Sequence, residues 1–265
     1  MSTTVTAPPV DPDAIAAEVA QSRAGKWARL AIQPVIVVAV VVGWAVWRNG
    51  ADFKAESVEG RSLAWGQILQ LTGQHILLSV VTTVIVLVLA IPLGIVLTRR
   101  HTRRLAPLVV GVANIGQAAP AIGLIVLSAL LFNIGFWPAV GAVSLYGLLP
   151  SLRNTIVGLE QVDQRLVEAG RGMGMSAPAV LFRVELPLAV PVIVAGARLA
   201  LVLVVGTMAL AGFVGAGGLG LLITTGIKLS RISVLISGAL LVAALALIID
   251  WIGRVVEEFA RPKGI

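Results

Sequence analysis

Few residues of this chain have the type and spacing that catalysis or metal binding requires. There is no cysteine, and the two histidines, His75 and His101, lie too far apart in sequence to suggest a metal site. No G-x-x-x-x-G-K-[ST] segment is present, so we expect no P-loop nucleotide site. We therefore predict no catalytic residue, no metal and no cofactor in this chain. A charged, glycine-rich stretch instead interrupts the otherwise apolar sequence over residues 167–191, VEAGRGMGMSAPAVLFRVELPLAVP.

This stretch predicts a compact knob made of two short helices. Apolar Leu166 and Val167 alternate with charged Glu168 and Arg171, as on a short surface helix. Glycines at 170, 172 and 174 are expected to end that helix, because Gly costs about 1 kcal/mol relative to Ala in a helix interior. A second short helix is expected over residues 177–182, after a cap at Ser176. A knob of this shape offers a soluble partner a surface to bind.

A second glycine-rich segment, GAGGLG, contains Gly215, Gly217, Gly218 and Gly220. It matches G-x-G-x-x-G, but it follows an apolar run rather than a strand, and no acidic residue lies about 20 positions further on. A dinucleotide site is therefore excluded. We interpret the glycines as a tight non-helical passage at the outer face of a membrane, part of a gate, which is tolerated where protein or a water-filled cavity surrounds it.

Other polar residues interrupt long apolar runs and are candidates for a gate or pathway: Asn114, Gln117, Pro120, Tyr146 and Arg198. An isolated amide within a bundle is more often a contact between helices than part of a pore. A buried Arg costs about 2.5–3.5 kcal/mol at the centre of a span. Arg198 is therefore expected either to reach the headgroups or pair with the knob, or to act in the pathway or in coupling.

Composition identifies the class of protein. The chain is 58% hydrophobic and 12% charged, with a mean hydropathy of +0.98, which leaves too little polar surface for a water-soluble globule. The net charge is +7, but the basic residues lie between apolar runs rather than along one polar face, which argues against nucleic-acid binding. We predict an all-α polytopic membrane protein with no nucleic-acid partner.

Six segments are predicted to span the bilayer, since about 20 apolar residues cross its hydrocarbon core. They are residues 31–47, 76–98, 105–132, 136–159, 188–213 and 232–252. The third is overlong and contains Pro107 and Pro120, which predict a kinked or broken helix. The segments at the N-terminus are a cytosolic tail over residues 1–30, with a short amphipathic helix around 15–30, and an extra span with an external segment over 31–74. Residues 75–253 form the transmembrane domain, and residues 254–265 a cytosolic tail.

Basic residues near the ends of spans are retained in the cytosol, which sets the orientation. The cluster RRHTRR at residues 99–104 and the knob fall on one side together with both termini. Few basic residues fall on the other side: Arg48, Lys54, Arg61, Lys228 and Arg231. The sequence therefore predicts cytosolic N- and C-termini and a cytosolic knob.

The knob also carries a resemblance to a known family. The cytosolic loop of ABC importer permeases has Glu-Ala-Ala, three residues, Gly, nine residues, Ile, any residue and Leu-Pro. This sequence keeps that spacing with Glu168, Ala169, Gly170, Gly174, Val184, Leu186 and Pro187. Gly170 replaces the second Ala and Val184 replaces Ile, and both changes are small.

The resemblance extends from about residue 75 to 253 and is nearest to the osmoprotectant branch, which imports glycine betaine, carnitine or choline. Segments that carry it include ANIGQAAPAIGL, YGLLPSLRNTIVGL and AGFVGAGGLG. It implies a prokaryotic cell-membrane permease coupled through residues 164–187 to cytosolic ATPase subunits, which bind the ATP. It also implies a second permease, identical or paralogous, and an extracytoplasmic solute-binding protein. We expect solute to be recognised mainly by that protein, because the Trp and Phe residues show no cluster in the sequence.

Two other classes remain as alternatives, an ion-coupled secondary transporter and a passive channel. Ion-coupled carriers usually place carboxylates within their spans, whereas here Glu185 and Asp250 lie only at span ends. Neither class explains a large cytosolic knob.

Overall fold

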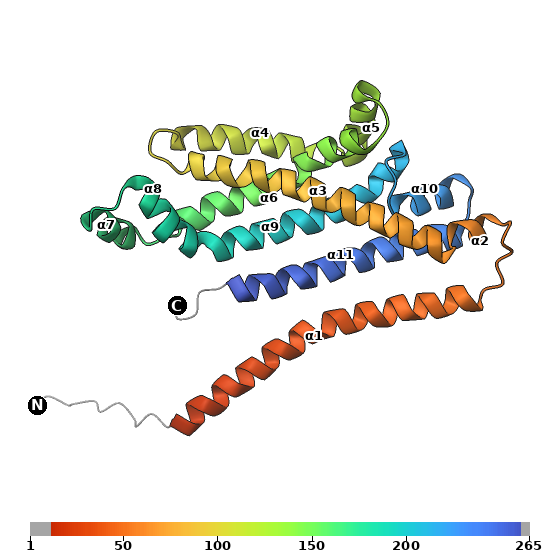
Figure 1. Cartoon of the computed structure of the whole chain (residues 1–265), viewed down its shortest axis with the longest axis horizontal. Coiled ribbons are helices and arrows are strands. Elements are labelled where there is room, and N and C mark those ends of the chain that lie inside the picture. The colour runs from red at the N-terminus through yellow and green to blue at the C-terminus, as the bar shows by residue number, and fades with distance from the viewer. Residues whose placement is uncertain (1–11, 261–265) are drawn as a thin grey trace, which may run out of the picture.

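The computed structural model describes residues 12–260, with side chains from residue 31 onward, and this part of the chain is helical (Figure 1). The α-helices are α1 (Pro12–Gly50), α2 (Val58–Ser62), α3 (Trp65–Leu97), α4 (Ala106–Ala118), α5 (Ala121–Phe132), α6 (Phe136–Glu160), α7 (Gln164–Gly172), α8 (Ala177–Val180), α9 (Leu186–Met208), α10 (Gly220–Lys228) and α11 (Ile232–Ala260). Two 3₁₀ segments, η1 (Arg103–Leu105) and η3 (Ala209–Val214), and one π-helical segment, η2 (Leu181–Glu185), complete the described elements.

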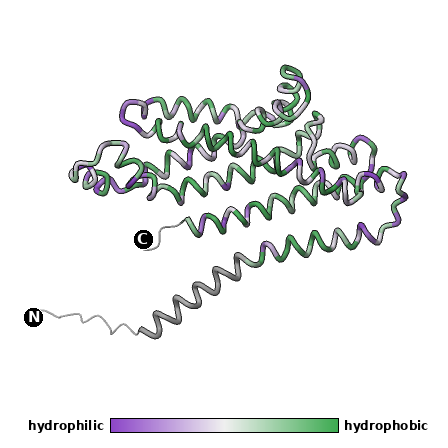
Figure 2. Tube along the Cα trace, in the orientation of Figure 1, coloured by the Kyte–Doolittle hydropathy of each residue, from purple (hydrophilic) through white to green (hydrophobic). Residues whose placement is uncertain are grey.

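The long helices lie side by side and alternate in direction (Figure 1). The knob of α7 and α8, the α3–α4 connection and the C-terminal end of α11 lie at one end of the bundle. The glycine-rich segment, α10 and α2 lie at the other end. Figure 2 shows that the long helices are mostly hydrophobic and that hydrophilic residues gather toward the two ends. This distribution fits a bundle that crosses a membrane.

Four helical segments are long and apolar enough to span a bilayer: Ala31–Gly50, Trp65–Leu97, Ala177–Val214 and Ile232–Ala260. A fifth span is formed if α4 and α5 cross together, and the two are bent by 92°. The predicted break in this third segment is confirmed, since α5 starts directly after Pro120. The remaining predicted span, residues 136–159, corresponds to α6, which is long enough to cross a bilayer but less apolar than the others. It is the central helix, and much of its surface contacts protein rather than lipid, including fully buried Ala139, Val143 and Leu152.

Other boundaries differ from the predictions in ways that packing explains. α3 begins at Trp65 rather than residue 76, and it carries the polar residue His75 buried inside the bundle. The predicted tail helix and first span form one continuous helix, α1. The fifth span tightens into 3₁₀ geometry after Met208, and α10 was not predicted at all.

α1 packs mainly against α11 and is held there by hydrogen bonds from two of its side chains. The indole N–H of Trp44 donates to Ser237 Oγ over 2.9 Å. The amide of Gln33 donates to the Leu247 carbonyl at 2.9 Å and to Asp250 at 3.2 Å. These contacts place the first span against the outside of the last one.

The aromatic residues do gather in space, contrary to the expectation from the sequence. Trp44 and Trp65, and Trp47 and Phe53, form edge-on pairs with ring centroids 5.8 Å apart. The Arg48 guanidinium lies 5.5 Å from the Trp65 ring centroid. This cluster joins α1 to the start of α3, and one of its rings is already covered by a cation from the chain itself.

Candidate functional site

The knob begins with α7, whose two faces differ. The carboxylate of Asp163 caps the helix by accepting the Arg165 N–H at 2.9 Å. Val167 and Gly170 are buried, while Glu168 and Ala169 are exposed. The predicted surface helix is therefore confirmed. The first two residues of the spaced motif, Glu168 and Ala169, lie on its exposed face.

A glycine turn ends α7 and reverses the chain. α7 ends at Gly172, and Gly174 has φ +82°, a conformation that favours glycine. The Met175 N–H donates back to the Gly170 carbonyl over 3.1 Å. This bond closes the turn tightly under α7, so that Met175 and Val180 pack below Gly170.

The helix predicted over residues 177–182 begins at Ala177 as expected, but it does not end near residue 182. α8 continues through η2 directly into α9, so it is an extension of a membrane-length helix rather than a separate short helix. Ser176 occupies the N-cap position, but its side chain makes no cap bond. In the π turn the Leu186 N–H bonds to the Leu181 carbonyl, five residues back. Pro187 directly follows this turn and has no N–H to donate to the Arg183 carbonyl.

Two ion pairs fasten the knob end of the bundle, and the sequence did not reveal them. Arg99 at the end of α3 lies 2.6 Å from Glu185 of η2, whose side chain is only 11% exposed. Arg103 lies 3.2 Å from Glu160 at the end of α6. Because Glu185 sits where the knob joins α9, its pair with Arg99 ties the knob to a second membrane helix.

At the opposite end of the bundle, the glycine segment forms the tight non-helical turn that the sequence predicted. Gly215, Gly217 and Gly218 have φ values of +67°, +91° and +74°. Gly220 is needed for a different reason, since a Cβ there would lie 1.9 Å from the Ala209 carbonyl oxygen. The turn folds back so closely on η3 that no side chain fits between the two backbones.

The remaining polar candidates do not converge on one site. The Tyr146 hydroxyl donates to the Ala119 carbonyl, directly before Pro120, so both residues shape the break between α4 and α5. Asn114 is exposed and Gln117 half-buried, and neither side chain makes a hydrogen bond with the described residues.

Arg198 points to α11 rather than to the knob or the headgroups. Its guanidinium lies 3.0 Å from Asp250 and 3.2 Å from Glu257, and all three side chains are at most 20% exposed. A Cβ on Gly253 would lie 2.6 Å from Arg198 Cγ, so the glycine makes room for the arginine stem. This cluster neutralises a charge that would otherwise be costly within an apolar helix.

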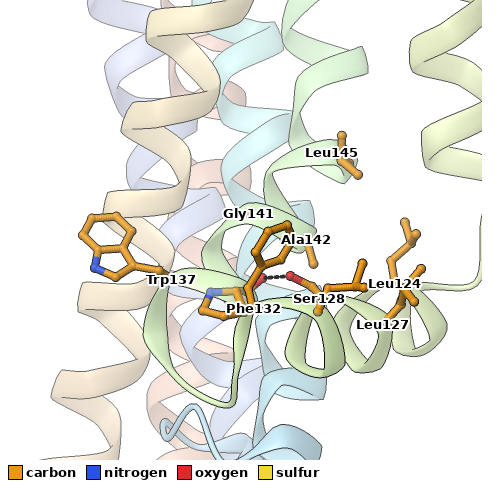
Figure 3. Close-up of a pocket in the computed structure, with 10 residues that line it drawn as sticks. Leu124, Leu127, Ser128, Phe132, Trp137, Gly141, Ala142 and Leu145 are labelled. Atoms are coloured by element: carbon orange, nitrogen blue, oxygen red, sulfur yellow. Dashed lines mark hydrogen bonds between the residues drawn. The ribbon is translucent and has the colours of Figure 1, made fainter.

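A groove of about 480 Å³ lies between α5 and α6 (Figure 3). Its walls are apolar and include Leu124, Leu127, Phe132 and Trp137. The Ser128 hydroxyl is its main polar group, and it already donates to the Pro138 carbonyl at 2.9 Å. Apart from Ser128, the lining side chains carry only one polar group, the indole N–H of Trp137, so the groove is poorly suited to a charged solute.

Within the described residues, no group of three or more His, Cys, Asp or Glu side chains could hold a metal ion. The structure thus combines a bundle of membrane-length helices, an exposed helical knob at one end and a close-packed glycine turn at the other. These features define a polytopic helical membrane protein.

Comparison with known proteins assigns the family. Residues 90–261 match the model of the binding-protein-dependent transport system inner membrane component, and the chain belongs to this family. It is 38% identical over 200 residues to the glycine betaine/carnitine/choline transport system permease protein OpuCB of Bacillus subtilis, covering 76% of this chain and 91% of that protein. It is 42% identical over 205 residues to the osmoprotectant import permease protein OsmW of Salmonella typhimurium, covering 76% of this chain and 94% of that protein.

The fold agrees with this assignment. A solved structure described as an inward facing conformation of the MetNI methionine ABC transporter superposes with a TM-score of 0.64 at 24% identity. The match covers 74% of this chain and 96% of that one. The resemblance to ABC importer permeases seen in the sequence is therefore confirmed.

Proposed function

We propose that this chain is the transmembrane subunit of an ATP-driven importer of osmoprotectants such as glycine betaine, carnitine or choline. The observation that carries the proposal is the exposed outer face of α7, which displays Glu168 and Ala169 at the spacing of an ATPase-binding loop. The names of the relatives support the solute class.

The surface of the knob suits a protein partner. Leu166 and Met173 are 49% and 72% exposed, beside the charged Glu168 and Arg171. Exposed apolar side chains rimmed by charges are typical of an interface. An ATPase subunit that binds there would hold the ATP itself, and it would push on α9 through η2 and on α3 through the Arg99–Glu185 pair.

The orientation follows from the position of the charges. Both termini of the described chain and the basic α3–α4 connection lie at the knob end, which we place in the cytosol of a prokaryotic cell (Figure 1). The glycine turn then lies at the outer face, where an extracytoplasmic binding protein delivers solute. A second permease, identical or paralogous, completes the pathway, which opens alternately to the two sides as helices rock.

Reconstitution in liposomes tests the function. The permease with its ATPase, binding protein and ATP should take up a betaine-like solute, and an ATPase that cannot hydrolyse ATP should abolish turnover. Flux driven by a proton or sodium gradient through the permease alone would identify a secondary transporter. Downhill flux without ATP or a gradient would identify a channel.

Substitution on the knob tests the coupling role. Glu168→Lys should insert and fold normally, because the side chain is exposed, but it should weaken ATPase association and uptake. Glu56→Lys, at an exposed glutamate in the α1–α2 connection at the opposite end of the bundle, is the control for the same change of charge. Equal ATPase association in both variants and the wild type would exclude this face of α7 as the coupling surface.

A further inference from the structure

The end of α9 leaves a backbone carbonyl that a distant residue satisfies. As α9 tightens into η3, the Ala209 N–H donates to the Gly206 carbonyl, three residues back. The Val205 carbonyl, four residues back, therefore lacks its usual helical donor. His75 of α3 takes that place, with Nε2 3.0 Å from the Val205 oxygen. Because a carbonyl only accepts, Nε2 carries the hydrogen.

The residue beside His75 holds the glycine turn. The Gly218 N–H donates to Gln74 Oε1 over 3.2 Å. The turn lies directly on this part of α3, since an added Cβ would lie 2.7 Å from Gln74 Oε1 at Gly217 and 3.0 Å from His75 Nδ1 at Gly218. Two adjacent residues of α3 thus bind two separate segments, the end of α9 and the glycine turn.

Packing alone does not account for a histidine here. His75 is fully buried, and its Nδ1 has no hydrogen-bond partner among the described residues. A buried unsatisfied nitrogen costs free energy that an apolar side chain of similar size would avoid. The feature that offsets this cost is the Nε2 bond to Val205.

We propose that Gln74 and His75 are positioning residues of the outer gate, which hold the glycine turn and the end of α9 against α3 as one unit. The proposal rests on the proposed function, in which this turn faces outward. In an assembled transporter, a movement of α9 that begins at the knob then moves α3 and the glycine turn as well, because the three segments are held together. Loss of the Gln74 bond frees the turn directly, and loss of the His75 bond frees the end of α9, which leads through η3 into the turn. In either case ATP is hydrolysed without uptake.

His75 donates its hydrogen bond and Gln74 accepts one, so each bond can be kept or removed by a different substitution. His75→Gln keeps an N–H donor near the Nε2 position, whereas His75→Leu removes it. Gln74→Glu keeps an oxygen acceptor, whereas Gln74→Leu removes it. Ser79→Ala is the matched control, because Ser79 is buried one turn further along α3 and its hydroxyl has no partner among the described residues.

Opening of the turn is measured with Ala216→Cys, a single thiol in a chain without cysteine. In the assembled transporter without nucleotide, a membrane-impermeant maleimide should label both Leu variants about tenfold faster than the parent, the effect expected from losing one hydrogen bond at a buried or half-buried site. The Gln, Glu and Ala variants should stay within about twofold of the parent, because their bonds are kept or were never made. The Leu variants should also hydrolyse more ATP per solute imported.

Equal labelling of the Leu variants and their conservative counterparts at both positions would overturn the proposal. If His75→Leu fails to assemble with the ATPase, the comparison of Gln74→Leu with Gln74→Glu tests the proposal. Both variants should still assemble, because the Gln74 side chain is only half-buried. If the parent transporter shows no ATP-dependent uptake, the proposed function fails, but the labelling rates still decide whether these residues hold the turn. Labelling only from the cytosolic side would refute the outward position of the turn and the gate with it.

Discussion

At the knob, a Cβ added to Gly174 would meet no described atom within 4 Å, yet this residue has φ +82°. At the opposite end, Gly220 has an ordinary φ, but a Cβ there would lie 1.9 Å from the Ala209 oxygen. Glycine is thus required at the knob by the backbone conformation of an open turn, and at residue 220 by contact between two backbones. The first turn is open to its surroundings, whereas the second is filled by its own chain.

The largest effect is expected at the packed end. Gly220→Ala should lower the free energy of unfolding by about 3 kcal/mol or more, because η3 and α10 must separate to admit the methyl group. Gly206→Ala is the control, since a Cβ there meets nothing within 4 Å and φ is helical. The yield of monodisperse protein and the midpoint of thermal unfolding measure both. Equal stability of the two variants would contradict the close approach.

A smaller effect on stability is expected at the knob. Gly174→Ala should cost about 1 kcal/mol, the penalty for an L-residue with positive φ. Gly172→Ala is the matched control, because its Cβ also meets open space but its φ is not positive. ATPase binding, measured by co-purification, should fall in the first variant and not in the second. A loss in both would mean that the partner, and not the turn conformation, excludes the side chain.

The Arg99–Glu185 ion pair also ties the knob to the bundle. Its contribution to stability should be similar to, or smaller than, the effect of Gly174→Ala. Arg99→Gln and Glu185→Gln, alone and together, form a double-mutant cycle whose coupling free energy should be about 1 kcal/mol, since Arg99 is partly exposed. Arg103 and Glu160 form the control pair, which is more exposed and should give less. Thermal unfolding at low and high salt measures both cycles. A larger coupling for the control pair would show that burial does not set the strength of these links.

The smallest effect, and the only favourable one, is expected at Gly170. A Cβ there would lie 3.5 Å from Val180 Cγ2 and 3.6 Å from Met175 Sδ, both ordinary contacts. Gly170→Ala should therefore leave stability unchanged or raise it by up to about 1 kcal/mol, because Ala favours the helix. The midpoint of thermal unfolding gives the result. Destabilisation would show that α7 packs more tightly than these distances indicate.

Much of the architecture was predictable because it depends on local sequence. The membrane class, the break before Pro120 and the surface helix that ends near Gly172 all follow from apolar length, a missing N–H and helix propensity. The motif in the knob and the non-helical turn at 215–220 were also visible. The family follows from the same motif residues, whereas the roles of the individual site residues stay predictions.

The tertiary structure decided what depends on pairs of residues far apart in the chain. α6 looks less like a span than its neighbours because protein, rather than lipid, covers it. His75 and Val205 meet across 130 residues, and Arg198 meets Asp250 across 52. Alone, each of the side chains of His75, Arg198 and Asp250 is an isolated polar group in an apolar run. Hydropathy and spacing indicate the free-energy cost of such a polar group, but only the packing of the helices shows which partner offsets that cost.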